Sequence, residues 1–525
     1  MLRRRRSVTS TLAALCVAAL ALTACSSGDT SAASAPGTPV GDPVSGGTLQ
    51  AIQIREPVSL DPVALPNVWT NSGLLGNALY GTLMTNDVDT LEIEYSMATD
   101  FSTDDGGRTF VLKLRPGLTF TDGTPLDAAA VAYNWDRLRD PANGSESIRQ
   151  AAQIAGTEVV DAETLKVTMV APSPVFASSL VLSGLNWIAS PTALAKGRQA
   201  FDENPVGAGP FTLTKWARQD VLELTRNPGY WDAPRPYLDG ITLRPVPDAN
   251  QRLNALTSGS AQLASESSWS NLSKAESAGL STSVVPLGGG QYLAMNTRRS
   301  PFDDARARRA VSLALDLDAI NTAVFEGTGT VPRTLFPETS PFFEDIALSN
   351  SDDAEAQRLF DELAADGTPV KFTFLAYSLV EIKSVAEVVQ AQLAAFDNVE
   401  IAVEIMDFTA AQARVAARDF DMTIAAAVVQ DPDSSLWTSF HARSQGNPTG
   451  IDDPELNDAL DAGRIGTTVE ERKAAYDVAQ QRLVDLAPGV FYVQSAPSVV
   501  SGPEVQGVRM YGMGSALLDA VWLSE

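Results

Sequence analysis

The stretch DDGGRTFVLKLRPGLTFTDGTPL, residues 104–126, places two turn dipeptides around a strand-like run. The dipeptides are Asp105-Gly106 and Asp122-Gly123, which are typical of tight turns between strands. Residues 109–114 lie between them and favour an extended conformation. The stretch therefore predicts an antiparallel hairpin unit.

Further strands and helices extend this unit in both directions along the chain. The other strand-like segments are residues 47–54, 164–170, 221–225, 241–245, 370–375, 401–405 and 422–429. A helix that Asp303 or Asp304 can cap follows from the apolar spacing of residues 307–315. A second helix, residues 384–396, lies between two strands, which predicts a βαβ unit with a parallel strand pair. We expect a mixed α/β fold.

Composition excludes several classes of function. The chain has 525 residues, enough for about three domains, with 64 acids against 38 bases and a net charge of -26. This charge repels phosphate and argues against a nucleic-acid partner. One histidine and two cysteines cannot build a multi-His or multi-Cys zinc site, and no Gly-x-Ser-x-Gly or phosphate-binding glycine loop occurs. We expect no cofactor, no metal and no catalytic residue.

The N-terminus predicts export and lipid attachment. Residues 3–6 are four arginines, and residues 12–22 form an apolar stretch too short for a membrane span. Residues 22–25 then read LTAC, which resembles the lipobox of bacterial lipoproteins, with Cys25 as the lipidated residue. Residues 1–24 are thus expected to be a signal peptide, for either Sec or twin-arginine export. Residues 25–45 are rich in small residues and predict a flexible tether.

An ordered set of motifs runs from residue 46 to the C-terminus. Besides residues 104–126, it comprises GGTL at 46–49, PVSLDP at 57–62, NPVGAGPF at 204–211, RNPGYW at 226–231, LD at 238–239 and PFDD at 301–304. Together these motifs resemble the extracellular solute-binding proteins of family 5, the peptide- and nickel-type receptors of ABC importers.

The resemblance implies a two-lobed α/β architecture. The fold would be periplasmic-binding-protein-like, of type II and the large cluster C type, with an inserted subdomain and a hinge. Lobe I would comprise residues 46–95, 200–285 and 495–525, the inserted subdomain residues 96–199, and lobe II residues 286–494. The ligand would be enclosed between the lobes by a hinge motion.

The resemblance also suggests where ligand contacts lie. The loop after the LDP motif reaches into the cleft in the family, and here it contains Asn67, Val68 and Trp69. Trp69 offers an aromatic face, although a core position is an equal alternative. Four further candidates lie in lobe II. Gln291 and Tyr292 lie where the chain enters lobe II from the hinge, and Tyr377 and Ser378 lie at the end of a strand. Lys383 is a further candidate for a ligand carboxylate, with a solvated lysine as the alternative.

The segment after Asp421 departs from the family pattern. Peptide-binding relatives place a tryptophan six residues later and an amine-binding aspartate nine residues later, whereas this chain has Ala427 and Gln430 there. Asp431 is adjacent and Trp437 follows, so Gln430, Asp431 and Trp437 are ligand-binding candidates. The alternative is a helix start that Asp433 or Ser434 caps, ahead of Leu436, Trp437 and Phe440. We expect Asp431→Ala and Trp437→Ala to weaken binding and leave the fold intact.

These observations predict a lipid-anchored receptor of an ABC importer, which binds a peptide or another small organic solute. Its partners would be the ligand, the permease subunits and a membrane reached through Cys25, on the extracytoplasmic face of the cell membrane. We expect a monomer and no enzymatic activity. A secreted carboxylate-dependent hydrolase, a metal-chelate receptor that uses His441, and a signalling receptor with the same fold remain alternatives.

Overall fold

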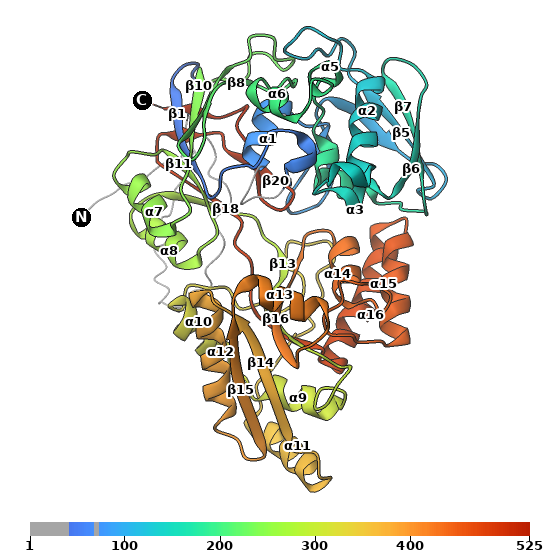
Figure 1. The fold of residues 1–525 in the computed structure, drawn as a ribbon, viewed down its shortest axis with the longest axis vertical. Helices are drawn as coiled ribbons and strands as arrows, with labels where there is room; N and C mark the ends of the chain where they lie inside the picture. The colour runs from blue at the N-terminus through green and yellow to red at the C-terminus, as the bar shows by residue number, and fades with distance from the viewer. Residues whose placement is uncertain (1–40, 68–72, 525) are drawn as a thin grey trace, which may run out of the picture. The chain divides into compact units, whose positions relative to one another are not determined.

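The computed structural model describes residues 41–67 and 73–524. The expected signal peptide, Cys25 and most of the tether lie outside the described residues, as do Val68 and Trp69. The described chain forms two lobes, each built on its own β-sheet (Figure 1). Within the described residues, no helix is both long and apolar enough to cross a bilayer.

Lobe I is built on a seven-stranded mixed sheet in the order β12-β18-β11-β1-β10-β9-β8. Its strands are β1 (Thr48–Gln53), β8 (Phe211–Ala217), β9 (Val221–Arg226), β10 (Gly240–Pro245), β11 (Leu263–Glu266), β12 (Ser281–Val284) and β18 (Ser498–Ser501). β1 pairs in parallel with both β10 and β11. The sheet therefore joins strands from near both ends of the described chain.

Short paired strands and helices, two of them within residues 96–199, also belong to lobe I. The strands are β2 (Met84–Asn86) with β3 (Ile93–Tyr95), β19 (Val505–Gln506) with β22 (Trp522–Leu523), and β20 (Arg509–Tyr511) with β21 (Ser515–Leu517). The helices are α1 (Gly73–Tyr80), α4 (Phe176–Val181), α5 (Pro191–Leu194), α6 (Arg198–Glu203), α7 (Ala249–Thr257) and α8 (Trp269–Ser277).

A second, four-stranded antiparallel sheet contains the motif with which the sequence analysis began. Its order is β4-β5-β7-β6, with β4 (Ala98–Ser102), β5 (Thr109–Leu114), β6 (Ile154–Val159) and β7 (Thr164–Met169). Burial alternates along β5, so that Phe110, Leu112 and Leu114 face the core. Helix α2 (Ala128–Arg139) packs on β6 and β7 (Figure 1), and α3 (Ile148–Ala151) packs on α2. The predicted antiparallel hairpin is confirmed, with Asp105 in its β4–β5 connection.

Lobe II is built on the five-stranded sheet β15-β14-β16-β13-β17. Its strands are β13 (Gly288–Met295), β14 (Val370–Tyr377), β15 (Val399–Met406), β16 (Met422–Val429) and β17 (Gly489–Val493). Its helices are α9 (Ala305–Leu313), α10 (Leu317–Phe325), α11 (Asp353–Ala365), α12 (Val380–Leu393), α13 (Phe408–Ala416), α14 (Pro432–Phe440), α15 (Pro454–Ile465) and α16 (Val469–Leu486).

The predicted βαβ unit of lobe II is confirmed. β14 and β15 pair in parallel over their full length, and α12 between them packs on both strands (Figure 1). α12 begins at Val380, four residues before the expected start. α9 is capped by Asp304, whose side chain accepts from the Arg306 backbone N–H, and it ends at Leu313, two residues before the expected apolar pattern does.

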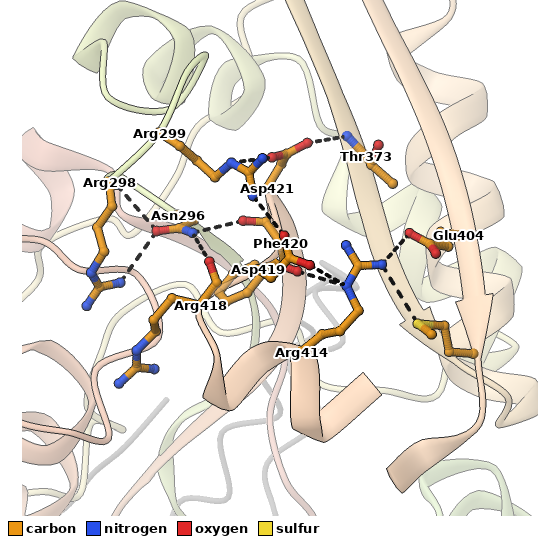
Figure 2. Close-up of polar contacts among 11 residues, drawn as sticks. Asn296, Arg298, Arg299, Thr373, Glu404, Arg414, Arg418, Asp419, Phe420 and Asp421 are labelled. Atoms are coloured by element: carbon orange, nitrogen blue, oxygen red, sulfur yellow. Dashed lines mark hydrogen bonds and ion pairs between the residues drawn. The ribbon is translucent and has the colours of Figure 1, made fainter. Parts of the chain in front are cut away.

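Asn296 ties the end of β13 to the segment that enters β16. Its side-chain Nδ2 donates to the carbonyl oxygens of Arg418 and Phe420 at 3.1 and 2.8 Å. Asp421 adds a second tie, since its Oδ2 accepts from the Thr373 backbone N–H at 2.9 Å. Figure 2 shows these contacts together, with Arg299 paired to Asp421 through Nε at 3.1 Å. The network holds three strands of lobe II in register from one end.

Two short segments connect the sheets of the two lobes. Residues 285–287 lead from β12 to β13, and residues 494–497 lead from β17 to β18. Each lobe has its own core, represented by Leu243 in lobe I and Phe374 in lobe II, both fully buried. Two separate cores joined by two short connecting segments are the arrangement of a hinge.

Candidate functional site

Gln291 lies on β13, four residues after the end of the first connecting segment, and its neighbour Tyr292 points to the opposite side of the sheet. Tyr292 is fully buried and packs against the rings of Phe440 and Phe491, with centroids 5.4 and 5.0 Å away. Burial raises the pKa of its phenol. Because strand neighbours face opposite sides, only Gln291 of this predicted pair stands away from that core.

Gln291 joins three other polar side chains in what we term the Glu381 cluster: Gln291, Tyr377, Glu381 and Tyr492. Gln291 Nε2 donates to Glu381 Oε1 at 3.4 Å, and Tyr492 Oη donates to Gln291 Oε1 at 2.6 Å. Burial raises the pKa of Glu381, and burial together with the charge of Glu381 raises that of Tyr377. The cluster thus presents one carboxylate among aromatic hydroxyl groups.

Glu381 lacks a cationic partner among the described residues. Lys383, two residues later on the same helix, pairs instead with Glu387 at 3.6 Å, and both side chains are more than half exposed. The Glu381 side chain is exposed, and a carboxylate that lacks a counter-charge is able to receive a ligand cation. Sequence reasoning missed Glu381 because an acid in the first turn of a helix is ordinarily a dipole-stabilising residue.

An apolar rim, defined as Leu379, Val380, Ile405 and Phe408, borders the cluster at the carboxyl ends of β14 and β15. Val380 is 86% exposed and Phe408 55% exposed, although both are large apolar side chains. The Phe408 ring meets the Tyr377 ring edge-on at 5.2 Å. Ser378, the other predicted residue here, donates its backbone N–H to Met406 O at 2.9 Å. This edge of lobe II therefore combines apolar contact area with an acidic group.

Gln430 makes a direct contact between the lobes. It is 6% exposed, and its Nε2 donates to the carbonyl oxygen of Gly512 in the β20–β21 hairpin at 2.6 Å. Leu91, in the β2–β3 connection of lobe I, packs against the lobe II core that contains Val429. Gln430 is thus a contact across the two lobes in this structure.

Asp431 and Trp437 belong to a network within lobe II. Asp431 caps α14 by accepting from the Asp433 N–H at 2.9 Å and pairs with Arg472 through two contacts of 2.6 and 2.9 Å. Trp437 donates Nε1 to Asp461 at 2.9 Å, and its ring lies between His441 and the guanidinium of Arg464. Both predicted residues are engaged by their own lobe.

His441 is 1% exposed and stacks on Trp437 with ring centroids 4.6 Å apart. Its Nδ1 accepts from the Arg443 N–H at 3.0 Å, and Nε2 lies 3.4 Å from Asp461. The imidazole is therefore occupied on both nitrogens. In the described part of the chain, no group of three or more His, Cys, Asp or Glu side chains is arranged to hold a metal ion.

Asn67 is the one predicted residue of the lobe I loop that the structure describes. It is 4% exposed, and its Nδ2 donates to Val181 O at 2.8 Å and to Tyr511 Oη at 3.0 Å. Its Oδ1 accepts from Ser515 Oγ at 2.6 Å. Asn67 thus anchors the start of this loop to the lobe I interior.

The structure brings Gln291 and Tyr377 together with Glu381, and Ser378 directly follows Tyr377 at the end of β14. Gln430 lies at the interlobe contact, and the remaining described candidates lie in the cores or networks of single lobes.

The fold and this site define a two-lobed binding protein. Residues 92–447 match the family of bacterial extracellular solute-binding proteins, family 5 middle, and the chain belongs to that family. It is therefore a family 5 solute-binding protein of the ABC importer class, which confirms the resemblance and the two-lobed α/β fold.

Individual proteins resemble this chain in sequence or in structure. The chain is 28% identical over 415 residues to the glutathione-binding protein GsiB of Shigella boydii, covering 74% of this chain and 79% of the relative. The structure of DppA from Helicobacter pylori in complex with the peptide STSA has a TM-score of 0.75 at 23% identity, over 92% and 99% of the two chains. That of NikA from Brucella suis in complex with Fe(III)-EDTA has a TM-score of 0.78 at 24% identity, over 91% and 100%.

Proposed function

We propose that this chain is the lipid-anchored substrate-binding component of an ABC importer, and that it captures a peptide or another small organic solute between its lobes for delivery to a permease. The observation that carries this proposal is the pair of connecting segments, 285–287 and 494–497, between two lobes with separate cores. Such a hinge supports closure around a ligand, and binding and release need no covalent chemistry.

We assign the residue ranges of the sequence analysis to the lobes in this proposal. Lobe I takes residues 46–95, 200–285 and 495–525, the inserted subdomain residues 96–199, and lobe II residues 286–494. The strands of the seven-stranded, four-stranded and five-stranded sheets support these ranges.

A peptide with a free amino group suits the Glu381 cluster. The carboxylate is without a counter-charge in the described chain, so an ammonium group would supply it, and Gln291 would hold the carboxylate in place at 3.4 Å. The apolar rim offers contact area for the rest of the ligand. The relative named as glutathione-binding makes glutathione the first peptide to test.

Calorimetric titration with glutathione and a panel of di- and tripeptides tests the ligand class. We expect saturable one-to-one binding of at least one peptide, with no product detected by mass spectrometry. Turnover would favour the hydrolase alternative. If no peptide binds and the natively purified protein releases a non-peptide molecule, that molecule is the ligand and the peptide proposal is wrong.

Anchoring through Cys25 is tested separately. We expect a radioactive fatty acid to label the full-length chain in growing cells and Cys25→Ser to remain unlabelled and leave the membrane fraction. The second cysteine of the chain, Cys16, lies within the proposed signal peptide, so Cys16→Ser is the matched control and should leave labelling unchanged. Labelling of Cys25→Ser at the normal level would contradict the anchor.

A further inference from the structure

Lobe I contains a polar cavity of about 290 Å³ that lies apart from the Glu381 cluster. Segments distant in sequence line it: residues of α1 through β3, the β9–β10 connection, and the C-terminal hairpin β20–β21 with the residues after it. Arg115 after β5 and Pro210 before β8 complete the lining. Its volume greatly exceeds what one water needs and is near the lower end, about 300 Å³, of the usual range for small-molecule sites.

Two residues that line this cavity each have one polar atom that is buried without a hydrogen-bond partner in the described chain. One is the indole donor Trp231 Nε1, and the other is the carboxylate acceptor Asp519 Oδ1. Asp519 is 8% exposed, and only its Oδ2 is engaged, by Arg235 at 3.2 Å and Arg509 at 3.9 Å. Buried polar atoms are almost always satisfied, so an unmatched donor and an unmatched acceptor in one cavity indicate a molecule that supplies both.

The charges around the cavity narrow the chemistry of that molecule. Three cationic and three acidic side chains line the cavity: Arg115, Arg235 and Arg509, and Glu94, Asp232 and Asp519. Because their charges cancel, a ligand with a single net charge would leave the cavity with a net charge. Within the described residues neither Arg115 nor Glu94 has an ion-pair partner, although Arg115 stacks over the Trp231 ring at 4.7 Å. Arg115 donates its Nε to Ser96 O, and Glu94 accepts from Thr85 Oγ1, so each is hydrogen-bonded but carries an unpaired charge. One unpaired cation and one unpaired acid, together with the unmatched donor and the unmatched acceptor, complement a zwitterion.

We propose that this cavity is a second binding site, which takes a small zwitterion of α-amino-acid type. The carboxylate of the ligand accepts from Trp231 Nε1 and Arg115, and its ammonium group donates to Asp519 Oδ1. Binding bridges the β9–β10 connection to the C-terminal segment, both of which belong to lobe I.

Equilibrium dialysis of the full chain with radiolabelled L-serine tests the site. We expect saturable binding by the wild-type protein, and at least about tenfold weaker binding in Trp231→Phe and Asp519→Asn, because each loses one charge-assisted contact. Propionate and ethylamine, which carry one charge each, should compete poorly. Melting curves confirm that each variant is folded.

Two control variants in lobe I match these changes outside the cavity. Trp216→Phe removes an indole N–H that Glu56 already accepts at 2.9 Å, and Asp239→Asn alters an exposed pair with Arg226. Both should bind L-serine within about twofold of wild type, as should Glu381→Gln, which separates this site from the Glu381 cluster. No saturable binding by the wild-type protein, equal competition by propionate, or loss of binding in Glu381→Gln would overturn the proposal.

Discussion

Arg472 holds Asp431 through two contacts of 2.6 and 2.9 Å, with the two side chains 6% and 8% exposed. The pair joins the start of α14 to α16, and burial leaves little water to replace either partner. The Arg472 guanidinium also lies over the ring of Phe342 at 4.9 Å. Asp431 is therefore a structural residue of lobe II rather than a free carboxylate for a ligand.

We accordingly expect Asp431→Ala to destabilise the protein, in contrast to the expectation from sequence. Loss of one partner of a buried pair costs about 3 to 5 kcal/mol because the other charge is left buried, and the helix cap is lost as well. Urea unfolding followed by far-UV circular dichroism measures the change. Glu400→Ala, which breaks the exposed pair with Lys371, is the control and should cost less than about 1 kcal/mol.

A double variant separates the lost pair from the lost side chain. Asp431→Asn with Arg472→Met keeps a capping side chain and removes both charges, so it should recover most of the stability that Asp431→Ala loses. If Asp431→Ala and the wild-type protein unfold at the same urea concentration, the pair contributes nothing to the stability of the protein. That result would support Asp431 as a ligand-binding residue instead.

Asn296→Ala should weaken the register of the lobe II sheet. Asn296 is 1% exposed, and its removal leaves the carbonyl oxygens of Arg418 and Phe420 without their side-chain donor (Figure 2). We expect a loss of about 2 to 4 kcal/mol, with faster hydrogen exchange in β13 and β16. Exposed Asn254 on α7 provides the control Asn254→Ala; equal exchange in the two variants would show that the Asn296 contacts add no stability.

Local elements of this fold were predictable from sequence, but contacts between distant residues were not. The strand at Thr109–Leu114 and the Asp304 cap depend on neighbouring residues, so patterns within a few positions suffice. The partner of Asp431 lies 41 residues away on another helix, and no local pattern specifies it. From sequence, ligand binding by Asp431 and a helix start capped by Asp433 or Ser434 therefore looked equally reasonable, whereas the residue that caps α14 is Asp431.

The candidate site shows the same division. Gln291 and Tyr292 are adjacent on a strand, so the alternation of side chains already implied that they face opposite sides of the sheet. Which one enters the core depends on Phe440 and Phe491, which come from later elements. Glu381 gave no distinct signal, because its lack of a counter-charge becomes visible only when the surrounding structure is known.

His441, the only histidine of the chain, provides a measurable pH dependence. Burial lowers its pKa; the charge of Asp461 opposes this shift, and that of Arg443 reinforces it, while Arg464 also faces the imidazole. The unfolded chain takes up this proton near pH 6.5 and the folded chain only at lower pH. The contribution of His441 to the free energy of unfolding is therefore complete above about pH 6.5 and is lost as the pH falls through the lowered pKa of the folded state.

A nuclear magnetic resonance titration of the single histidine signal should give a midpoint below 6.5. The free energy of unfolding should fall between about pH 7 and pH 5.5 more steeply in the wild-type protein than in His441→Gln. The comparison of the two proteins removes the contribution of buried acids such as Asp433, whose raised pKa acts in the opposite direction. A midpoint at or above 6.5 would contradict the prediction.

Glu381→Gln tests whether the Glu381 cluster binds an ammonium group. The change keeps the shape of the side chain and its contact with Gln291 but removes the charge, so glutathione should bind about tenfold more weakly or worse. Glu387→Gln on the same helix alters an exposed pair with Lys383 and should stay within about twofold of wild type. N-acetylglutathione, which lacks the ammonium charge, should bind the wild-type protein and Glu381→Gln equally.

The pH profile of the same titration provides an independent check. Burial raises the pKa of Glu381, so its negative charge, and with it the affinity for glutathione, should be lost at a higher pH than for an ordinary glutamate. Affinity should therefore fall as the pH decreases through this raised pKa, and Glu381→Gln should show no such fall. If the affinity for glutathione depends on pH in the same way in both proteins, the amino group of the peptide is held elsewhere. A carboxylate that contacts the ammonium group must change the affinity of the protein for glutathione when it titrates.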